Sequence, residues 1–165
     1  MELSLFRENF ARVPRHVAVL GLCKDGEIYG VTISSLQSVS VNEQQQILTF
    51  VLKKNSYFSS LLNQAKEFTI NFLANNQEEI SKTYSDNGRA VGNRIEETTW
   101  SRSKLNLVFV KGATFSIIAT LINSIELEES DIFFVSADQI IESNEIGMLL
   151  YCERTYGAFN SWKNV

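Results

Sequence analysis

Residues 30–40 read Gly-Val-Thr-Ile-Ser-Ser-Leu-Gln-Ser-Val-Ser and form the most informative stretch of the chain. Because successive side chains of a strand point to opposite faces, Val31 and Ile33 are predicted to enter a core while Thr32 and Ser34 face away from it. Three further serines follow along a bend or a second short strand: Ser35, Ser38 and Ser40. Rows of hydroxyls and backbone N–H groups suit a phosphate-bearing ligand. An exposed edge strand rich in Ser and Thr would have the same composition.

The composition is that of one globular domain. The chain has 165 residues, of which 44% are hydrophobic and 21% charged, and both fractions are ordinary for a soluble protein. The net charge of -4 and the sequence pI of about 5.1 provide no field that would attract nucleic acid or an anionic membrane. We therefore expect no nucleic-acid partner.

The ends and the cysteines indicate a cytoplasmic protein. Residues 1–8 carry charges too early for a secretory signal. The sequence contains no run of about 18 apolar residues that could span a membrane. Cys23 and Cys152 lie in apolar runs without a CxxC pair, which is typical of free thiols.

Three helices are predicted from apolar spacing and capping. Leu3–Arg12 has apolar residues three and four apart and ends before Pro14, because the residue preceding a proline is pushed out of the helical region. Tyr57–Gln64 follows Ser56, which is a suitable N-cap. Gln77–Tyr84 is the third.

The strands favour a β-rich fold. Asp25-Gly26 separates the strand-like runs His16–Lys24 and Ile28–Ser34, and this dipeptide is typical of a tight hairpin. Five more runs are predicted as strands: Ile47–Leu52, Phe68–Leu73, Ala113–Leu127, Asp131–Ile141 and Met148–Cys152. Six or seven strands with short helices at their connections predict a mainly β (α+β) fold, a closed or partly closed antiparallel barrel.

Two segments are predicted to lack regular structure. Ser85–Asn106 has two glycines, several basic residues and no apolar period, so it is interpreted as a long loop or lid in which Trp100 packs onto another part of the chain. A polar tail follows Cys152.

The side chains offer little catalytic chemistry of their own. His16, the one histidine, begins an apolar strand, and no GxSxG or GxGxxG motif accompanies it. A zinc site would need ligands at a spacing that the sequence does not offer. Glu128, Glu129 and Asp131 are typical of a solvated turn; paired-carboxylate chemistry stays open without a feature that favours it. The sequence thus favours a borrowed cofactor or a non-enzymatic role.

Short motifs follow one another in order along the chain: Phe10-Ala11 and Pro14 with Val17 and Val19; Asp25-Gly26, Gly30, Thr32, Ser34-Ser35 and Ser38-Val39-Ser40; Lys53 with Asn55-Ser56; Phe68, Asn71, Leu73 and Gln77; Gly112-Ala113; Arg154 with Tyr156. In this order they resemble the flavin reductase-like family of FMN-binding split barrels, the reductase components of two-component monooxygenases. The resemblance covers nearly the whole chain and implies a single split-barrel domain over residues 1–165.

The resemblance implies a cofactor, a co-substrate and partners. It implies a homodimer that binds FMN or FAD near the subunit interface, takes hydride from NADH or NADPH, and supplies reduced flavin to a partner monooxygenase. It implies flavin contacts from Thr32, Ser34, Ser35, Ser38, Lys53, Asn55, Ser56 and Arg89. Hydroxyls and N–H groups would bond phosphate oxygens and Lys53 would add a point charge. Alternatively, Lys53 is a solvated strand end and Ser56 only a helix cap.

The chain departs from the family's pattern at two places, of which the first alters only a turn and the second concerns the chemistry. Asn42–Gln45 replaces a common Pro-Pro turn, and the family's GDH motif reads Ser130-Asp131-Ile132. In the family, the histidine of this motif is associated with the nicotinamide side of the site. Ile132, which stands in its place, can neither donate a hydrogen bond nor carry charge. The nicotinamide side is therefore assigned only to Asp131, Arg154 and Tyr156, although the last two also fit a terminal-strand cation and a packed aromatic. The leading hypothesis is an NAD(P)H-dependent flavin reductase. The alternatives are a flavin-binding protein that does not use nicotinamide, and a split barrel that has lost flavin.

Overall fold

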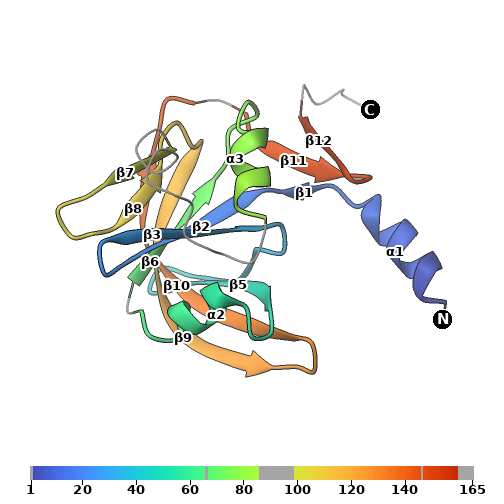
Figure 1. The fold of residues 1–165 in the computed structure, drawn as a ribbon, viewed down its shortest axis with the longest axis horizontal. Coiled ribbons are helices and arrows are strands. Elements are labelled where there is room, and N and C mark those ends of the chain that lie inside the picture. Colours follow the sequence, from blue (N-terminus) through green and yellow to red (C-terminus); the bar gives the residue numbers. More distant parts are fainter. Residues whose placement is uncertain (1, 66, 86–98, 146, 160–165) are drawn as a thin grey trace.

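The computed structural model describes residues 2–65, 67–85, 99–145 and 147–159 (Figure 1). Within these ranges the chain forms, in order, α1 (Leu3–Ala11), β1 (Arg15–His16), β2 (Ala18–Lys24), β3 (Glu27–Ile33), β4 (Gln37–Val41), β5 (Gln46–Lys53), α2 (Tyr57–Leu62), β6 (Glu67–Phe72), α3 (Glu78–Thr83), β7 (Trp100–Arg102), β8 (Val108–Val110), β9 (Phe115–Glu126), β10 (Ser130–Glu142), β11 (Leu149–Cys152) and β12 (Thr155–Ala158).

Seven strands make one antiparallel sheet in the order β3-β2-β6-β9-β10-β5-β4, so β3 and β4 are its two edges. The short segment that connects β3 to β4, which contains Ser35, therefore joins the two edges of the sheet. The Ser35 hydroxyl donates to the Val51 carbonyl at 3.3 Å and accepts the Val51 N–H at 3.0 Å. This double contact brings the end of β3 onto β5 and curls the sheet into a split barrel. The predicted mainly β, antiparallel split-barrel fold is confirmed.

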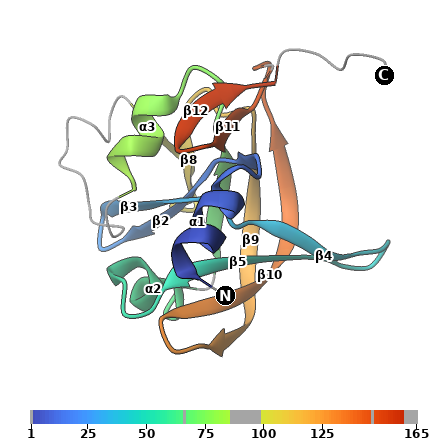
Figure 2. The same cartoon turned by 90° about the vertical axis from the view of Figure 1, so that its right-hand side faces the viewer.

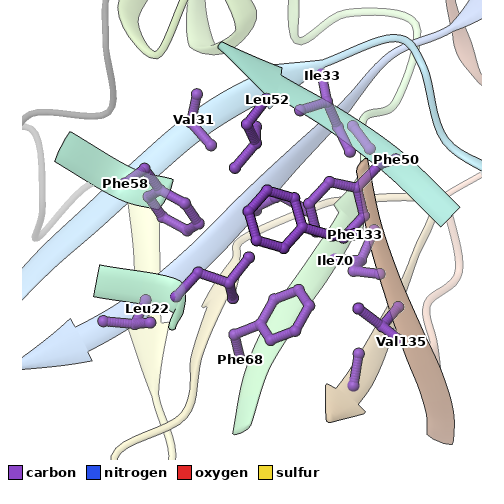
Figure 3. Close-up of a cluster of buried hydrophobic side chains, with 14 of the residues drawn as sticks. Leu22, Val31, Ile33, Phe50, Leu52, Phe58, Phe68, Ile70, Phe133 and Val135 are labelled. Atoms are coloured by element: carbon purple, nitrogen blue, oxygen red, sulfur yellow. The ribbon is translucent and has the colours of Figure 1, made fainter. Parts of the chain in front are cut away.

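The barrel interior is aromatic (Figure 3). Phe50 stacks on Phe133 with ring centroids 5.4 Å apart and meets Phe68 edge-on at 6.1 Å. Strand β2 is buried on both faces: Leu20 faces this interior, whereas Val19 faces a second apolar cluster. An unbroken apolar run is typical of a strand covered on both sides.

The second cluster is built around Trp100. Gly21 and Gly30 face each other across β2 and β3, and the Trp100 ring lies against both. Its Nε1–H donates to the Tyr84 hydroxyl at 2.6 Å. Trp100 therefore packs onto the barrel as expected, but the interpretation of residues 85–106 as one loop is wrong in its described part. Residues 100–102 form β7, which pairs with β8.

Other expectations are corrected by the tertiary structure. The described residues hold twelve strands, more than the predicted six or seven. Strand β12 lies in the predicted polar tail and is held by pairing with β11. The predicted turn is confirmed, since Asp25 and Gly26 have φ of 52° and 84°.

Helix α1 stands apart from the barrel (Figures 1 and 2). None of its residues is buried, and its contact with the sheets is at its C-terminal end, where Ala11 accepts the Glu153 N–H at 2.7 Å. Figure 2 also shows the β4–β5 hairpin projecting from the body. Both features leave apolar side chains uncovered, including Phe6, Phe10 and Val41.

Candidate functional site

The open face of β3 borders a hollow of about 200 Å³ between β3, α3 and the β11–β12 hairpin. Val31 and Ile33 are buried, whereas Thr32 and Ser34 are half-buried and line the hollow, as the alternation predicts. The hollow is lined by Val17, Thr32, Ile33, Ser34, Ser81, Ser85, Tyr151 and Tyr156.

Helix α3 is tied to both sides of this hollow. Thr32 Oγ1 donates to the Ser81 carbonyl at 2.7 Å, and the Thr32 N–H donates to the Tyr84 carbonyl at 2.8 Å. The Ser81 hydroxyl lies 2.9 Å from the Tyr156 hydroxyl. Figure 1 shows α3 beside β11 and β12. Both donors of Thr32 are therefore engaged within the fold and tie β3 to α3 and the residue that follows it.

A second group of predicted residues lies along β5 and the following turn. Lys53 is exposed at the end of β5, two residues beyond Val51, to which Ser35 bonds. It makes no ion pair with any residue that the structure describes. Asn55 turns the chain with φ of 58°, and Ser56 caps α2 by accepting the Ser59 N–H at 3.2 Å.

Ser38 and Arg89 stand apart from both groups. Ser38 is exposed on edge strand β4, opposite Leu48 of β5. Arg89 lies outside the described residues.

Asp131 and Ile132, which end the Ser130-Asp131-Ile132 motif, face opposite sides of β10. Asp131 points inward beneath α2, and its Oδ2 accepts the Ser59 hydroxyl at 3.3 Å. Its Oδ1 is buried and has no hydrogen bond within the described part of the chain. Ile132 points outward between Val51 of β5 and Ile125 of β9. The position expected to hold a histidine thus lies in an apolar row.

The structure separates Arg154 from Tyr156. Glu153 and Arg154 form the tight β11–β12 turn with φ of 50° and 62°. Arg154 borders a shallow depression beside α1, together with Arg12 and Glu153. Tyr156 instead reaches the hollow, where its ring lies 5.0 Å from the Tyr151 ring.

Sequence reasoning missed Ser81, Ser85 and Tyr151. No local signal marks them, because Ser81 sits within an ordinary helical pattern and meets Thr32 only through a separation of 49 residues.

His16 lies against the Phe72 ring at 5.3 Å, and burial lowers its pKa. No group of three or more acidic, His or Cys side chains in the described ranges is placed to hold a metal ion. None of the described helices is long and apolar enough to cross a membrane.

The sequence matches the model of the flavin reductase like domain over residues 10–160. The chain therefore belongs to the flavin reductase-like domain family, a family of oxidoreductases. No curated protein is similar enough in sequence to count as a relative.

Solved structures share the fold across nearly the full length. A flavin reductase domain protein from Arthrobacter sp. FB24 is 19% identical with a TM-score of 0.83, and the match covers 97% of each chain. The NADH:FAD oxidoreductase of Streptomyces globisporus C-1027, solved with NAD and FAD fragments, is 17% identical with a TM-score of 0.82, over 95% of this chain and 92% of that one. The styrene monooxygenase flavin reductase of Pseudomonas putida S12 is 18% identical with a TM-score of 0.81, over 96% and 99%.

Proposed function

We propose that the chain is an NAD(P)H-dependent flavin reductase that supplies reduced FMN or FAD to a partner monooxygenase in the cytoplasm. The observation that carries this proposal is the alternation of side chains along β3. Thr32 and Ser34 face an open surface lined by hydroxyls, while Val31 and Ile33 are buried. Similarity to a reductase of a styrene monooxygenase and to an NADH:FAD oxidoreductase supports the same activity.

The chemical groups of the candidate residues suit a flavin nucleotide. Ser34 offers a hydroxyl beside the hollow, and Lys53 offers an exposed ammonium without an ion pair within the described chain. An ammonium and hydroxyls are suited to phosphate and ribityl oxygens. Ser35, which follows Ser34, bonds to Val51 of β5, two residues before Lys53. A bound flavin would supply the two-electron acceptor that these side chains lack; the protein would bind it, orient it and exclude water.

We propose further that the chain works as a homodimer. Apolar side chains remain uncovered on the outer face of the sheet, where Val51 and Ile125 flank Ile132, and on α1, which has no buried residue. A nine-residue helix is marginal alone in water, so burial of its apolar side chains against a second copy would stabilise it. Sedimentation of the purified chain measures this directly.

The proposed activity is tested by titrating the purified chain with FMN and FAD and then following NADH and NADPH oxidation. We expect saturable flavin binding and oxidation of at least one donor that depends on both protein and flavin. Flavin binding without donor oxidation would contradict the reductase proposal and leave the second candidate below. No flavin binding would contradict both.

The second candidate is a flavin-binding protein that does not take electrons from nicotinamide. The apolar row Val51–Ile132–Ile125 favours it, since no member of the row can hydrogen-bond a carboxamide or carry charge. The buried position of Asp131 beneath α2 also favours it, because that carboxylate contacts Ser59 and not the outer face.

The Ile132→His variant tests whether the missing histidine limits the use of nicotinamide. If a missing donor limits nicotinamide binding, the variant should raise kcat/KM for NADH or NADPH about tenfold, as expected for one hydrogen bond to a polar substrate group. Steady-state kinetics with excess flavin measure this. Ile140→His, at an exposed isoleucine near the other end of β10, is the matched control and should change little. Equal kinetics in the wild type and the Ile132→His variant would count against this explanation.

A further inference from the structure

We propose that Asp131 is a positioning residue for the turn of residues 53–56, here called the flavin turn, and not a contact for nicotinamide. Asp131 acts through Ser59 of α2, the helix that follows this turn. The inference rests on the proposed function, because that function assigns Lys53 to the flavin phosphate.

Asp131 lies on the inner face of the sheet, whereas the position expected to meet nicotinamide lies on the outer face. Asp131 is paired across the strands with Leu52 of β5, which belongs to the apolar cluster of the barrel interior (Figure 3). Both residues are buried. Ile132, which stands in the place of the motif histidine, is paired with Val51 on the outer face. A nicotinamide that met position 132 would therefore be separated from the Asp131 carboxylate by the sheet.

The Asp131 carboxylate is buried, which costs free energy unless a partner compensates the charge. Asp131 forms no ion pair with any residue that the structure describes, and its Oδ1 has no hydrogen bond there. Its Oδ2 accepts the Ser59 hydroxyl at 3.3 Å. Both residues are buried, so water does not compete for this contact, and the charge of the acceptor strengthens it. The contact with Ser59 is therefore what a carboxylate provides here and an apolar residue would not.

Ser59 transmits this contact to the flavin turn. The Ser59 N–H donates to the hydroxyl of Ser56, the N-cap of α2, at 3.2 Å. The Ser56 N–H in turn donates to the Lys53 carbonyl at 3.2 Å. Because Asp131 holds the Ser59 side chain and Ser56 holds its backbone, the first turn of α2 and the flavin turn move as one unit. A displacement of Ser59 from β10 would therefore shift the backbone that carries Lys53.

Lys54 provides further contacts between the flavin turn and the β9–β10 connection, but these involve exposed groups. The Lys54 N–H donates to the Glu129 carbonyl at 3.1 Å, and Lys54 Nζ donates to the Leu127 carbonyl at 3.2 Å. Lys54 Nζ also lies 3.3 Å from the carboxylate of Glu126, whose side chain is 77% exposed. Exposed contacts of this kind stabilise little, because water competes for the same groups. The Asp131–Ser59 contact is buried and joins β10 directly to α2.

The Asp131→Ala variant is expected to raise the Kd for FMN about fivefold, as for one lost hydrogen bond, while the KM for the nicotinamide donor at saturating flavin stays unchanged. Asp131→Asn removes the charge but keeps an oxygen that accepts the Ser59 hydroxyl, so its Kd for FMN should stay within about twofold of the wild type. Fluorescence titration with FMN and steady-state kinetics measure these constants. A higher KM for the donor in both variants, with unchanged FMN binding, would overturn the inference, because the carboxylate would then serve nicotinamide.

The Ser59→Ala variant tests the same contact from the other side and removes a single hydroxyl, so it provides the test even if Asp131→Ala does not fold. It should raise the Kd for FMN about fivefold as well, and the double variant should lose no more than either single variant. Ser60→Ala is the matched control and should leave the Kd unchanged, because the exposed Ser60 hydroxyl donates to the Tyr57 carbonyl of the same helix. An unchanged Kd in Ser59→Ala, or additive losses in the double variant, would overturn the inference.

Amide hydrogen exchange of the flavin-free protein distinguishes this inference from the proposed function. In Asp131→Ala and in Ser59→Ala, residues 57–62 should exchange about fivefold faster than in the wild type, because α2 loses its buried contact with β10. Exchange in α3 should not change. Unchanged exchange in α2 would overturn the inference whatever the flavin titration shows. Absence of flavin binding by the wild type would instead contradict the proposed function, and with it the assignment of the flavin turn.

Discussion

The Asn71→Asp variant is expected to lose about 3–5 kcal/mol of unfolding free energy at neutral pH, a large part of the stability of an ordinary domain. Asn71 is fully buried, and its Nδ2 donates to the Val19 carbonyl and to Thr69 Oγ1, both at 3.0 Å. Its Oδ1 accepts the Val110 N–H at 3.1 Å and the Ser116 hydroxyl at 2.8 Å. One amide thus joins β6 to β2, β8 and β9.

The substitution keeps the size of the side chain but turns the contact with the Val19 carbonyl into one between two acceptors. It also removes the donor to Thr69, whose hydroxyl is already donated to the Val108 carbonyl. It also places a carboxylate where water cannot reach it. Burial raises the pKa of the introduced carboxyl above its unfolded value, so the folded variant binds that proton more tightly than the unfolded chain does. The variant should therefore regain stability as the pH falls from 7 towards 5, while the wild type changes less.

Urea unfolding followed by tryptophan fluorescence at pH 7 and pH 5 measures both effects. Asn123→Asp is the matched control, because Asn123 is exposed on β9 and should change stability by less than about 0.5 kcal/mol. A loss below about 1 kcal/mol in the Asn71→Asp variant would show that the amide is not the hub that these distances indicate.

The Gly30→Val variant is expected to lose about 3 kcal/mol of unfolding free energy, because the space that the new side chain needs is already filled. A Cβ at Gly30 would lie 2.6 Å from Tyr84 Cδ1 and 3.1 Å from Trp100 Cζ2. Both rings are buried and joined by a hydrogen bond of 2.6 Å, so neither can move away alone. Displacing Tyr84 would also weaken its carbonyl contact with the Thr32 N–H.

Urea unfolding and an FMN titration together measure this prediction, since the strain acts on the strand assigned to flavin. We expect a lower unfolding midpoint and weaker FMN binding. Gly157→Ala provides the control: a Cβ there would meet no atom within 4 Å, so stability should be unchanged. Wild-type stability in the Gly30→Val variant would contradict the close packing of Trp100 and Tyr84 on this strand.

Much of the fold could be predicted because its signals are local. Strand β3 shows its two faces in the alternation of Val31 and Ile33 with Thr32 and Ser34, and Asp25-Gly26 marks the turn before it. Strands β7 and β8, of three residues each, and β12, of four, show no such pattern, because they are held by pairing with one another or with β11.

The candidate site also has a part that local sequence signals predict and a part that they do not. The sequence by itself determined the family, the barrel and the direction in which Thr32 and Ser34 point, since these depend on residue order and on the period of a strand. Only the tertiary structure decided which polar groups meet. Ser81 reaches Thr32 across 49 residues, and the turn at Glu153 and Arg154 sends Arg154 towards α1 and Tyr156 into the hollow. Hydrogen bonds between distant backbone segments decide these placements, and local periodicity carries no record of them.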